Sequence, residues 1–314
     1  EQQRIILARA LAQKTDCLIL DEPTNHLDIK YQLQLLDIVK SLGITVIGAL
    51  HDLNIAAAYC DRIYAMKNGR LVACGTPEEV IKPGVADIVV VCTNSFTKDV
   101  FDKLVFVMER GMNVITSAEE MAYPQAQEPE LAKKLDEIAK KNGVSVMGTG
   151  INPGLIMDLL VVLWTAACEE VNHVTSRRVN SLSPFGPAVM EEQGIGISVE
   201  EFNERKANGT MAGHVGFAES TMMICDALGW KWEDFGQDME PIVTDVDRKS
   251  PYGFAAAGQV AGVAMKGWVN IDGERKIDMD HPQQIEPEQV GVHTGDYVIL
   301  DAVPPVNMVN TPEI

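Results

Sequence analysis

The sequence of 314 residues lacks the features that mark several common protein classes. Its six cysteines form no C-x-x-C pair and no cluster with histidine at zinc-binding spacing, so reduced and mostly buried thiols are expected. The longest apolar run begins at Leu155, has 14 residues and contains Asp158. A run of this length is too short to cross a membrane. We therefore expect neither a zinc site nor direct membrane insertion.

Basic residues are also scarce, because 26 Lys and Arg stand against 45 Asp and Glu and the formal net charge is −19. Such a charge argues against nucleic acid and anionic membrane as partners. Residues 1–82 contain 9 basic and 10 acidic side chains, whereas residues 83–314 contain 17 and 35. This asymmetry predicts two parts of different origin. The sequence opens without a charged and then apolar leader, so a cytoplasmic location is expected.

Residues 1–82 alternate between helix and strand patterns. We expect helices at 1–13, 29–43 and 53–61, buried strands at 17–23 and 44–51, and a hairpin at 62–75 that turns at Asn68-Gly69. The acid pair Asp21-Glu22 ends the first strand. One carboxylate can hold Mg²⁺ through water while the next orients or deprotonates an attacking water. A pair that simply ends a strand is the plainer alternative, but Asp28 and the pair His51-Asp52 favour nucleotide hydrolysis.

The stretches EQQRIILARAL, LILDEPTNHLD, ALHDL and MKNGRLVACGTPEEV resemble the C-terminal part of ATP-binding-cassette ATPases that serve metal-chelate importers. The resemblance implies that Asp21 holds Mg²⁺, Glu22 is the general base, Asp28 is the D-loop acid and His51 senses the γ-phosphate. It also implies a permease as the partner in the parent family. No G-x-x-x-x-G-K-[ST] loop occurs in the sequence, and the LSGG signature and the Q-loop are missing. Because that loop positions the phosphates, ATP hydrolysis with Mg²⁺ is not expected here.

From residue 83 the pattern changes to strands and helices joined by short loops. The expected elements are a strand that runs into a polar turn at 85–96, a turn, strand and loop at 111–120, a strand that ends in a Gly-rich turn at 144–154, and helices at 98–110 and 128–143. This order predicts βαβ units and a parallel sheet. Ligands of such sheets lie beyond the carboxyl ends of the strands. The segments 92–96, 117–124 and 148–154 are therefore expected to form a site, although ordinary turns share their composition.

Residues 154–314 show longer segments, which predict an α+β domain with an open sheet flanked by helices. We expect a buried helix at 155–168, a strand at 171–182, a helix opened by the capping box Ser198-x-x-Glu201, a helix at 217–229 and several later strands. The fold class is therefore α/β, with a truncated Rossmann-like sheet before the α+β domain. The domains expected are 1–82, 83–153 and 154–314, the last for substrate binding and oligomerisation.

Residues 86–314 also resemble a known family. The matching stretches are NVITSAEEMAYPQAQEPELAKK, GTGINPGLIMDLL, RRVNSLSPFGP, GHVGFAES, ALGW, DHPQQIEPE and GDYVIL. They are similar to 2,4-diaminopentanoate dehydrogenases, within the dihydrodipicolinate-reductase-like group of NAD(P)-dependent enzymes. The resemblance implies oxidative deamination to 2-amino-4-oxopentanoate, with hydride passing to NAD or NADP. The G-x-G-x-x-G turn that binds the pyrophosphate in this family is missing, so weakened cofactor binding is expected.

Amine oxidation needs a group that keeps the amine neutral, a group that activates water and a cation for the substrate carboxylate. The candidates are Glu120 and His214 for catalysis, Glu119, Asn152 and Arg178 for the substrate, and Thr93, Asn94, Ser95, Gly148, Thr149 and Gly150 for the cofactor. Each has a structural alternative, such as a solvated loop acid or, for Asn152, a helix cap. We expect His281 to be structural. Arg177 and Arg178 should face opposite ways in their strand, and we favour Arg178.

Three functions remain open at this stage. The leading one is an NAD(P)-dependent dehydrogenase that acts on a small amino acid as a homo-oligomer, with impaired nucleotide binding. The second is an ATP-binding importer subunit, equally incomplete. The third is a non-catalytic or artificial fusion of two parts, joined near residues 76–87. The residue that would distinguish NAD from NADP belongs to the missing segment, so both cofactors remain candidates.

Overall fold

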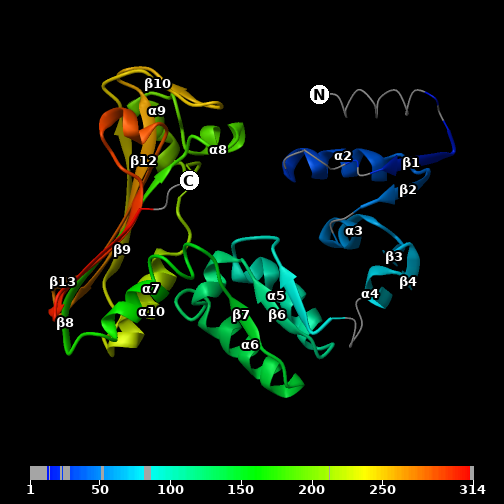
Figure 1. The fold of residues 1–314 in the computed structure, drawn as a ribbon, viewed down its shortest axis with the longest axis horizontal. Coiled ribbons are helices and arrows are strands. Elements are labelled where there is room, and N and C mark those ends of the chain that lie inside the picture. Colours follow the sequence, from blue (N-terminus) through cyan, green and yellow to red (C-terminus); the bar gives the residue numbers. More distant parts are fainter. Residues whose placement is uncertain are drawn as a thin grey trace. The chain divides into compact units, whose positions relative to one another are not determined.

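The computed structural model describes residues 13, 15–21, 23, 29–50, 53–80, 86–211 and 213–311 (Figure 1). Contacts between residues divide the chain into two compact units, Glu1–Ala86 and Asp87–Ile314. We call them the N-terminal unit and the C-terminal unit and describe each by itself. In these described ranges no helix is both long enough and apolar enough to span a bilayer.

The N-terminal unit contains a parallel strand pair with helices and a β-hairpin. Its elements are β1 (Cys17–Asp21), α2 (Ile29–Ser41), β2 (Thr45–Ala49), α3 (Leu53–Tyr59), β3 (Ile63–Lys67), β4 (Arg70–Gly75) and α4 (Pro77–Val80). Strands β1 and β2 pair in parallel, and β3 and β4 pair in antiparallel fashion. The predicted turn between β3 and β4 is confirmed, because Asn68 and Gly69 have φ values of 50° and 72°. The predicted helix at 1–13 lies almost wholly outside the described residues.

Only one face of the β1–β2 pair is buried. Leu18 packs with Leu35 and Val39 of α2 and with Ile55 of α3. On the opposite face Ile19 is 75% exposed, and its register partner Ile47 is 58% exposed. The expectation of two fully buried strands is therefore wrong for this face, since the packing helices cover the other one. An apolar run alone does not show whether one or both faces are covered.

The first part of the C-terminal unit is a three-stranded parallel sheet in the order β5-β6-β7. Its elements are β5 (Ile88–Val91), α5 (Thr97–Met108), β6 (Asn113–Thr116), the 3₁₀ helix η1 (Glu119–Ala122), α6 (Pro129–Asn142) and β7 (Val146–Gly148). The predicted βαβ pattern is confirmed, and each strand lies inside its expected range. Val91 and Val114 are buried on one face, whereas Val90 and Met147 on the other are 52% and 54% exposed.

The second part of the C-terminal unit is built on a six-stranded sheet in the order β15-β14-β8-β13-β12-β9 (Figure 1). Its strands are β8 (Glu170–Ser181), β9 (Phe235–Val243), β12 (Val260–Ile271), β13 (Glu274–Gln284), β14 (Gly295–Val303) and β15 (Val306–Asn310), with a separate small pair β10 (Arg248–Lys249) and β11 (Phe254–Ala255). Its helices are α7 (Leu159–Thr165), α8 (Pro187–Glu192), α9 (Val199–Ala207), α10 (Phe217–Leu228) and the 3₁₀ helix η2 (Pro287–Val290). Strands β8 and β13 are parallel, and the other pairs of the large sheet are antiparallel.

Helix α10 packs on the large sheet and forms part of its main core. Phe217 and Ile224 of this helix belong to the same buried cluster as Val263 and Met265 of β12. A Cβ atom added at Gly267 of β12 would lie 2.8 Å from the Phe217 ring, so glycine permits this close approach. Helix α10 thereby holds its first turn against the middle of the sheet.

Of two predicted helix starts, that of α9 is confirmed and that of α7 is wrong. The predicted cap of α9 is confirmed, because Ser198 Oγ accepts a hydrogen bond from Glu201 N at 3.1 Å. The helix expected at 155–168 is shorter and begins only at Leu159. The reason is Asp158, whose Oδ1 accepts a hydrogen bond from Leu159 N at 2.6 Å and so caps the helix start. The preceding apolar residues lie in turns.

Candidate active site

A hydrogen bond joins the segments that follow the neighbouring parallel strands β5 and β6. Asn94 Oδ1 accepts hydrogen bonds from Ser95 N at 2.7 Å and from Phe96 N at 3.4 Å, which fixes the turn after β5. The carbonyl oxygen of Ser95 accepts a hydrogen bond from Glu120 N at 3.1 Å. The structure therefore brings the predicted cofactor residues of β5 next to the acid pair after β6. The side chains of Thr93 and Asn94 are exposed.

The two acids of η1 have different environments. Glu120 is only 8% exposed, and its Oε2 accepts a hydrogen bond from Thr97 N at 2.7 Å. This contact caps α5, whose N-cap residue Phe96 has no side-chain acceptor. Glu119 is half-buried. The carboxylate of Glu120 is thus engaged in holding the fold, and that of Glu119 is the better candidate for contact with a ligand.

The glycine-rich turn after β7 is required by packing. A Cβ atom at Gly148 would lie 1.9 Å from the carbonyl oxygen of Met121, and one at Gly150 would lie 2.7 Å from that of Pro153. Thr149 N donates a hydrogen bond to the carbonyl oxygen of Thr116 at 3.0 Å, which joins the turn to β6. The sequence assigned Gly148, Thr149 and Gly150 to the cofactor, and close backbone contacts already account for both glycines.

The same turn contacts the N-terminus of α10. A Cβ atom at Gly216, the N-cap of α10, would lie 2.5 Å from Pro153 Cγ. Next to this contact the side-chain oxygen and nitrogen of Asn152 are both buried without a hydrogen-bond partner in the described structure. Asp158 holds the arrangement, because its Oδ2 accepts hydrogen bonds from Gly154 N at 2.6 Å and from Ser220 Oγ at 3.0 Å. The side-chain amide of Asn152 therefore has no protein partner in the described structure and can bind a ligand.

His214 lies two residues before α10 and faces the large sheet. Its ring is 4.6 Å from that of Phe217 and 5.2 Å from that of His281, measured between centroids. Its backbone N donates to Met265 Sδ at 3.0 Å, and its Nε2 is buried with no partner among the residues described. Burial, aided by the charges of His281 and Arg178, lowers the pKa of His214 to about 3. The imidazole is therefore neutral at physiological pH.

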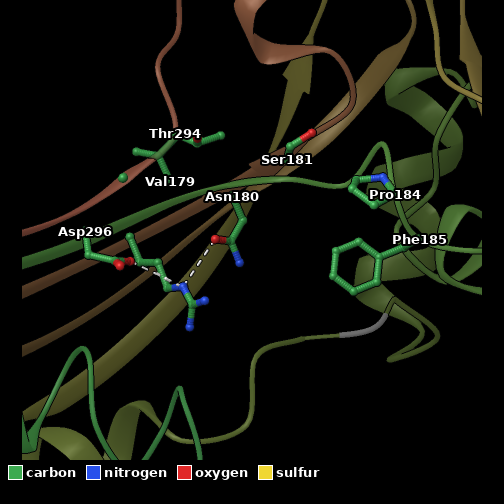
Figure 2. Close-up of a pocket in the computed structure, with 9 residues that line it drawn as sticks. Val179, Asn180, Ser181, Pro184, Phe185, Thr294 and Asp296 are labelled. Atoms are coloured by element: carbon green, nitrogen blue, oxygen red, sulfur yellow. Dashed lines mark hydrogen bonds and ion pairs between the residues drawn. The ribbon is translucent and has the colours of Figure 1, made fainter. Parts of the chain in front are cut away.

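Arg178 forms one wall of a pocket of about 300 Å³ in the large-sheet part. The pocket is lined by Arg178, Val179, Asn180, Ser181, Pro184, Phe185, Thr294, Gly295 and Asp296. Arg178 Nε lies 3.2 Å from Asn180 Oδ1 and 3.4 Å from Asp296 Oδ1. In Figure 2 dashed lines from Asn180 and Asp296 meet at this guanidinium, and Phe185 stands across the pocket from Asp296. A half-open space between a cation and an aromatic ring suits a small organic anion.

The neighbouring arginine points the other way, as the strand pattern predicts. Arg177 Nε pairs with Asp280 Oδ2 at 2.9 Å, whereas Arg178 pairs with Asp296. Burial lowers the pKa of Arg178, and the charge of Asp296 opposes that effect. Burial raises the pKa of Asp296, and Arg178 opposes it in turn. Both members of the pair are thus partly desolvated, which makes the pocket sensitive to any charged ligand.

Sequence reasoning missed Glu219, in the first turn of α10. This residue is 0% exposed, and its Oε1 accepts a hydrogen bond from Gln127 Nε2 at 2.7 Å. Its Oε2 is buried and has no partner in the described part of the chain. Burial, with smaller contributions from Glu120 and Glu119, raises the pKa of its carboxyl group. An acidic side chain in the first turn of a helix is usually explained by its favourable interaction with the helix dipole, so the sequence did not single out this residue. The available signal was its place inside the otherwise uncharged stretch FAESTMMIC.

The remaining predicted site residues belong to the N-terminal unit. Asp21 is exposed at the carboxyl end of β1, as expected for the end of a parallel strand. Glu22, Asp28 and His51 lie outside the described residues. Where the structure describes the chain, no group of three or more His, Cys, Asp or Glu side chains could hold a metal ion.

Comparison with known proteins identifies the larger part of the chain. Residues 155–314 match the 2,4-diaminopentanoate dehydrogenase C-terminal domain. The 2,4-diaminopentanoate dehydrogenase of Acetoanaerobium sticklandii is 62% identical over 280 residues, which cover 88% of this chain and 79% of that protein. A petrobactin import ATP-binding protein of Bacillus anthracis is 49% identical over 85 residues, or 26% of this chain and 31% of that protein. The second resemblance is therefore confined to a short segment.

A solved structure shares the fold. The amine dehydrogenase from Mycobacterium smegmatis superposes with a TM-score of 0.58 at 18% sequence identity, covering 94% of this chain and 86% of that one. The predicted mixed α/β class, with a Rossmann-like parallel sheet and an open sheet domain, is confirmed. The sequence identity over most of the chain and the matched C-terminal domain show that the protein belongs to the 2,4-diaminopentanoate dehydrogenase family.

Proposed function

We propose that the protein is an NAD(P)-dependent dehydrogenase that oxidatively deaminates 2,4-diaminopentanoate to 2-amino-4-oxopentanoate. The observation that supports this most is the gathering of unpartnered buried polar atoms at the start of α10. Four of the seven such atoms in the described structure belong to Asn152, His214 and Glu219. Buried polar groups are normally hydrogen-bonded, so a cluster of unpaired ones is typical of a ligand site.

The pocket at Arg178 suits the amino-acid end of this substrate. The guanidinium is a fixed cation that can bind a carboxylate through two parallel hydrogen bonds. Asp296, on the same wall, offers an anion for the adjacent ammonium group. Because burial raises the pKa of Asp296 and lowers that of Arg178, ligand charges of the opposite sign favour the ionised form of both. A zwitterionic head group thus fits this pair.

A nicotinamide cofactor would lie beyond the carboxyl ends of β5 and β7. Exposed hydroxyl and amide side chains at the end of β5, those of Thr93 and Asn94, fit the ribose edge of its nicotinamide half. When bound, the cofactor accepts the hydride. Ser95 and the turn Gly148–Gly150 would form the rest of the surface around the cofactor. Whether NAD or NADP is used depends on groups at the adenosine end, so both are included.

The chemistry at the amine would involve the half-buried Glu119, His214 and Asn152. Hydride leaves a carbon only when the attached nitrogen is a neutral amine, so a base must hold the ammonium proton. Glu119, at the end of β6, is our candidate for that base. His214 is neutral at physiological pH because its pKa is about 3, and its unpartnered Nε2 can accept a hydrogen bond from the water that attacks the imine. Asn152 would orient the imine through its free amide.

We also propose the three-part organisation of 1–82, 83–153 and 154–314, with a homo-oligomer in the cytoplasm. A second proposal concerns residues 1–82, as a segment descended from an importer ATPase. Its support is the short match to import ATP-binding proteins and the position of Asp21 at the end of β1. In that setting Asp21 would bind Mg²⁺, with Glu22 as base and His51 near the γ-phosphate of ATP. A fusion of the two segments is part of this proposal.

The decisive experiment is to mix the full-length protein with 2,4-diaminopentanoate and either NAD or NADP and to follow the fluorescence of the reduced nicotinamide. We expect reduction that depends on the diamino acid, together with release of ammonia. Phosphate release from ATP, measured on the same preparation, should be absent, because the sequence contains no G-x-x-x-x-G-K-[ST] loop. Absence of reduction with both nucleotides, in a protein shown by circular dichroism to be folded, would reject the dehydrogenase proposal.

A further inference from the structure

The carboxylate of Glu219 has an incomplete set of partners. Only Oε1 accepts a hydrogen bond, from Gln127, while Oε2 is buried and unpaired in the described structure. The side chain is 0% exposed, so water does not replace the missing partner at the surface. An ionised carboxylate in such a place is unfavourable, because burial removes its hydration without a compensating charge. The site is therefore poised to gain a hydrogen-bond donor with positive charge.

Two more acids lie near Glu219. Glu120 and Glu119 are close enough for their charges to raise the pKa of its carboxyl group further. Glu120 is committed to capping α5 through Thr97 N, but Glu119 is half-buried at the strand end. No basic side chain contributes to the pKa shift of Glu219. A concentration of negative charge around one unpaired oxygen favours a cationic ligand over a neutral one.

The position of Glu219 also indicates which group of a diamino acid its carboxylate would bind. Its helix is tied through Gln127 to the segment that follows η1, on the side of the parallel sheet. The cation Arg178 belongs to β8 of the large sheet, where it pairs with Asp296. The proposed function assigns the substrate carboxylate to Arg178, which leaves the more distant amine, the one at C4, as the cation available to Glu219.

We propose that Glu219 binds the ammonium group at C4 of the diamino acid, together with Glu119, and that it thereby selects substrates with this second amine. The inference rests on the proposed function for the identity of the ligand. Burial favours the protonated form of Glu219 in the free protein, and the bound ammonium favours the carboxylate, whose proton passes to solvent. The bond broken is the carboxyl O–H bond, and the new contact is an ion pair between carboxylate and ammonium.

The test is calorimetric titration of the full-length protein with 2,4-diaminopentanoate at a series of acidic to neutral pH values. Repeating each titration in two buffers with different heats of ionisation gives the number of protons released. We expect the wild type to release protons from this site when the ligand binds. Glu219→Gln should release none and bind about tenfold to a hundredfold more weakly, as for loss of a charged hydrogen bond.

Three controls separate ligand binding from a purely structural role. 2-Aminopentanoate lacks the C4 amine, so wild type and Glu219→Gln should bind it equally and without proton release. Gln127→Leu removes the hydrogen bond to Oε1 but leaves the carboxylate, so proton release should persist in that variant. Glu130→Gln, a matched change at an exposed acid of α6, should behave as the wild type. If Glu219→Gln fails to fold, proton release in Gln127→Leu and the comparison of the two ligands in the wild type still test the inference.

The possible outcomes distinguish this inference from the proposed function. Equal affinity and equal proton release in wild type and Glu219→Gln would overturn the inference, even if the wild type reduces nicotinamide. An equal loss of affinity for 2-aminopentanoate would also overturn it, because it would indicate a general structural effect. Proton release that depends on Glu219 supports it even where no hydride transfer is seen. If the wild type binds none of the ligands, the inference is rejected together with the proposed substrate.

Discussion

His281 Nδ1 and the backbone carbonyl oxygen of Arg178 lie 2.9 Å apart and form a hydrogen bond between β13 and β8. Because a carbonyl oxygen can only accept, the ring carries its proton on Nδ1 and leaves Nε2 as the basic nitrogen. His281 is 4% exposed, and its burial, together with the charge of Arg178, lowers its pKa to about 4. The histidine therefore fixes the strand that presents the pocket arginine while remaining uncharged.

This relationship predicts a pH dependence of stability. The folded-state pKa of His281 is about 4 and the unfolded value is about 6.5, so between these values the unfolded chain binds more protons. Stability from this group is complete above a pH of about 6.5 and is lost as the pH falls toward 4, by up to about 3 kcal/mol. Urea unfolding at a series of pH values should show a steeper decline for the wild type than for His281→Asn, whose side chain keeps a donor for the Arg178 carbonyl.

The control for this experiment is His293→Asn, at an exposed histidine outside the core. Its pH profile should run parallel to that of the wild type. Identical slopes for wild type and His281→Asn would show that His281 is not the titrating group. His214, whose pKa is also lowered, should leave a residual slope in the His281→Asn variant.

A second prediction concerns the pocket arginine. The double variant Arg178→Met/Asp296→Asn removes the ion pair without leaving one charge buried alone. The dissociation constant for 2,4-diaminopentanoate should rise about tenfold to a hundredfold, as expected for loss of a charged hydrogen bond worth about 1.5–3 kcal/mol. Binding of butan-2-amine, which lacks both the carboxylate and the C2 amine, should change little by comparison. Calorimetric titration of both ligands measures the difference.

Arg177→Met is the matched comparison, because Arg177 is adjacent in sequence and faces the opposite side, toward Asp280. We expect this variant to retain affinity for the diamino acid. Equal weakening by both arginine changes would mean that charge in general, and not the Arg178 pocket, determines binding.

A third prediction concerns the buried carboxylate of Asp158. Asp158→Ala removes the acceptor for Leu159 N, Gly154 N and Ser220 Oγ, of which the first two hydrogen bonds are partly buried and the third is buried. The free energy of unfolding should fall by about 2–4 kcal/mol, since each unsatisfied group costs about 1–3 kcal/mol and partial relaxation is normal. Urea denaturation measures the change. Glu137→Ala, at an exposed position of α6, should stay within about 0.5 kcal/mol of the wild type.

A fourth prediction concerns the close approach of β7 to η1. In Gly148→Ala the new Cβ would lie 1.9 Å from the Met121 carbonyl oxygen, so the backbone must move. We expect a loss of about 2 kcal/mol or more, as for overpacked sites. Gly186→Ala is the comparison, because a Cβ there meets no atom within 4 Å, and its effect should be below about 1 kcal/mol. Thermal unfolding of the two variants tests the contrast, and similar midpoints would contradict it.

The sequence predicts the order of elements well where periodicity and caps agree. The βαβ pattern from β5 to β7, the cap at Ser198 and the opposite directions of Arg177 and Arg178 all follow from local rules. The early helix start at Leu155 was wrong because apolar spacing cannot reveal that Asp158 folds back as a cap. The exposure of Ile19 was missed because burial of a strand face depends on which helices cover it.

Site residues are harder to predict, because their roles depend on contacts between distant segments. Glu120 looked free at a strand end, yet its carboxylate reaches Thr97, 23 positions earlier. Glu219 lies in the first turn of α10, yet its carboxylate contacts Gln127, in the loop before α6, and the residue is completely buried. Spacing within a segment does not encode such pairings. What the sequence does indicate is the edge of the sheet at which they occur.

The registers of β8 with its two neighbouring strands have a consequence for the make-up of the Arg178 pocket. Asp280 is opposite Arg177 on one side of β8, and Asp296 is opposite Arg178 on the other. A slip of one residue would turn Arg178 away from the pocket and present Arg177 in its place. The identity of the pocket cation is therefore a property of strand register. Exchange of Asn180 or Phe185 would alter the pocket lining and keep its cation, whereas a one-residue insertion in β8 would turn the lining positions of this strand to the opposite face.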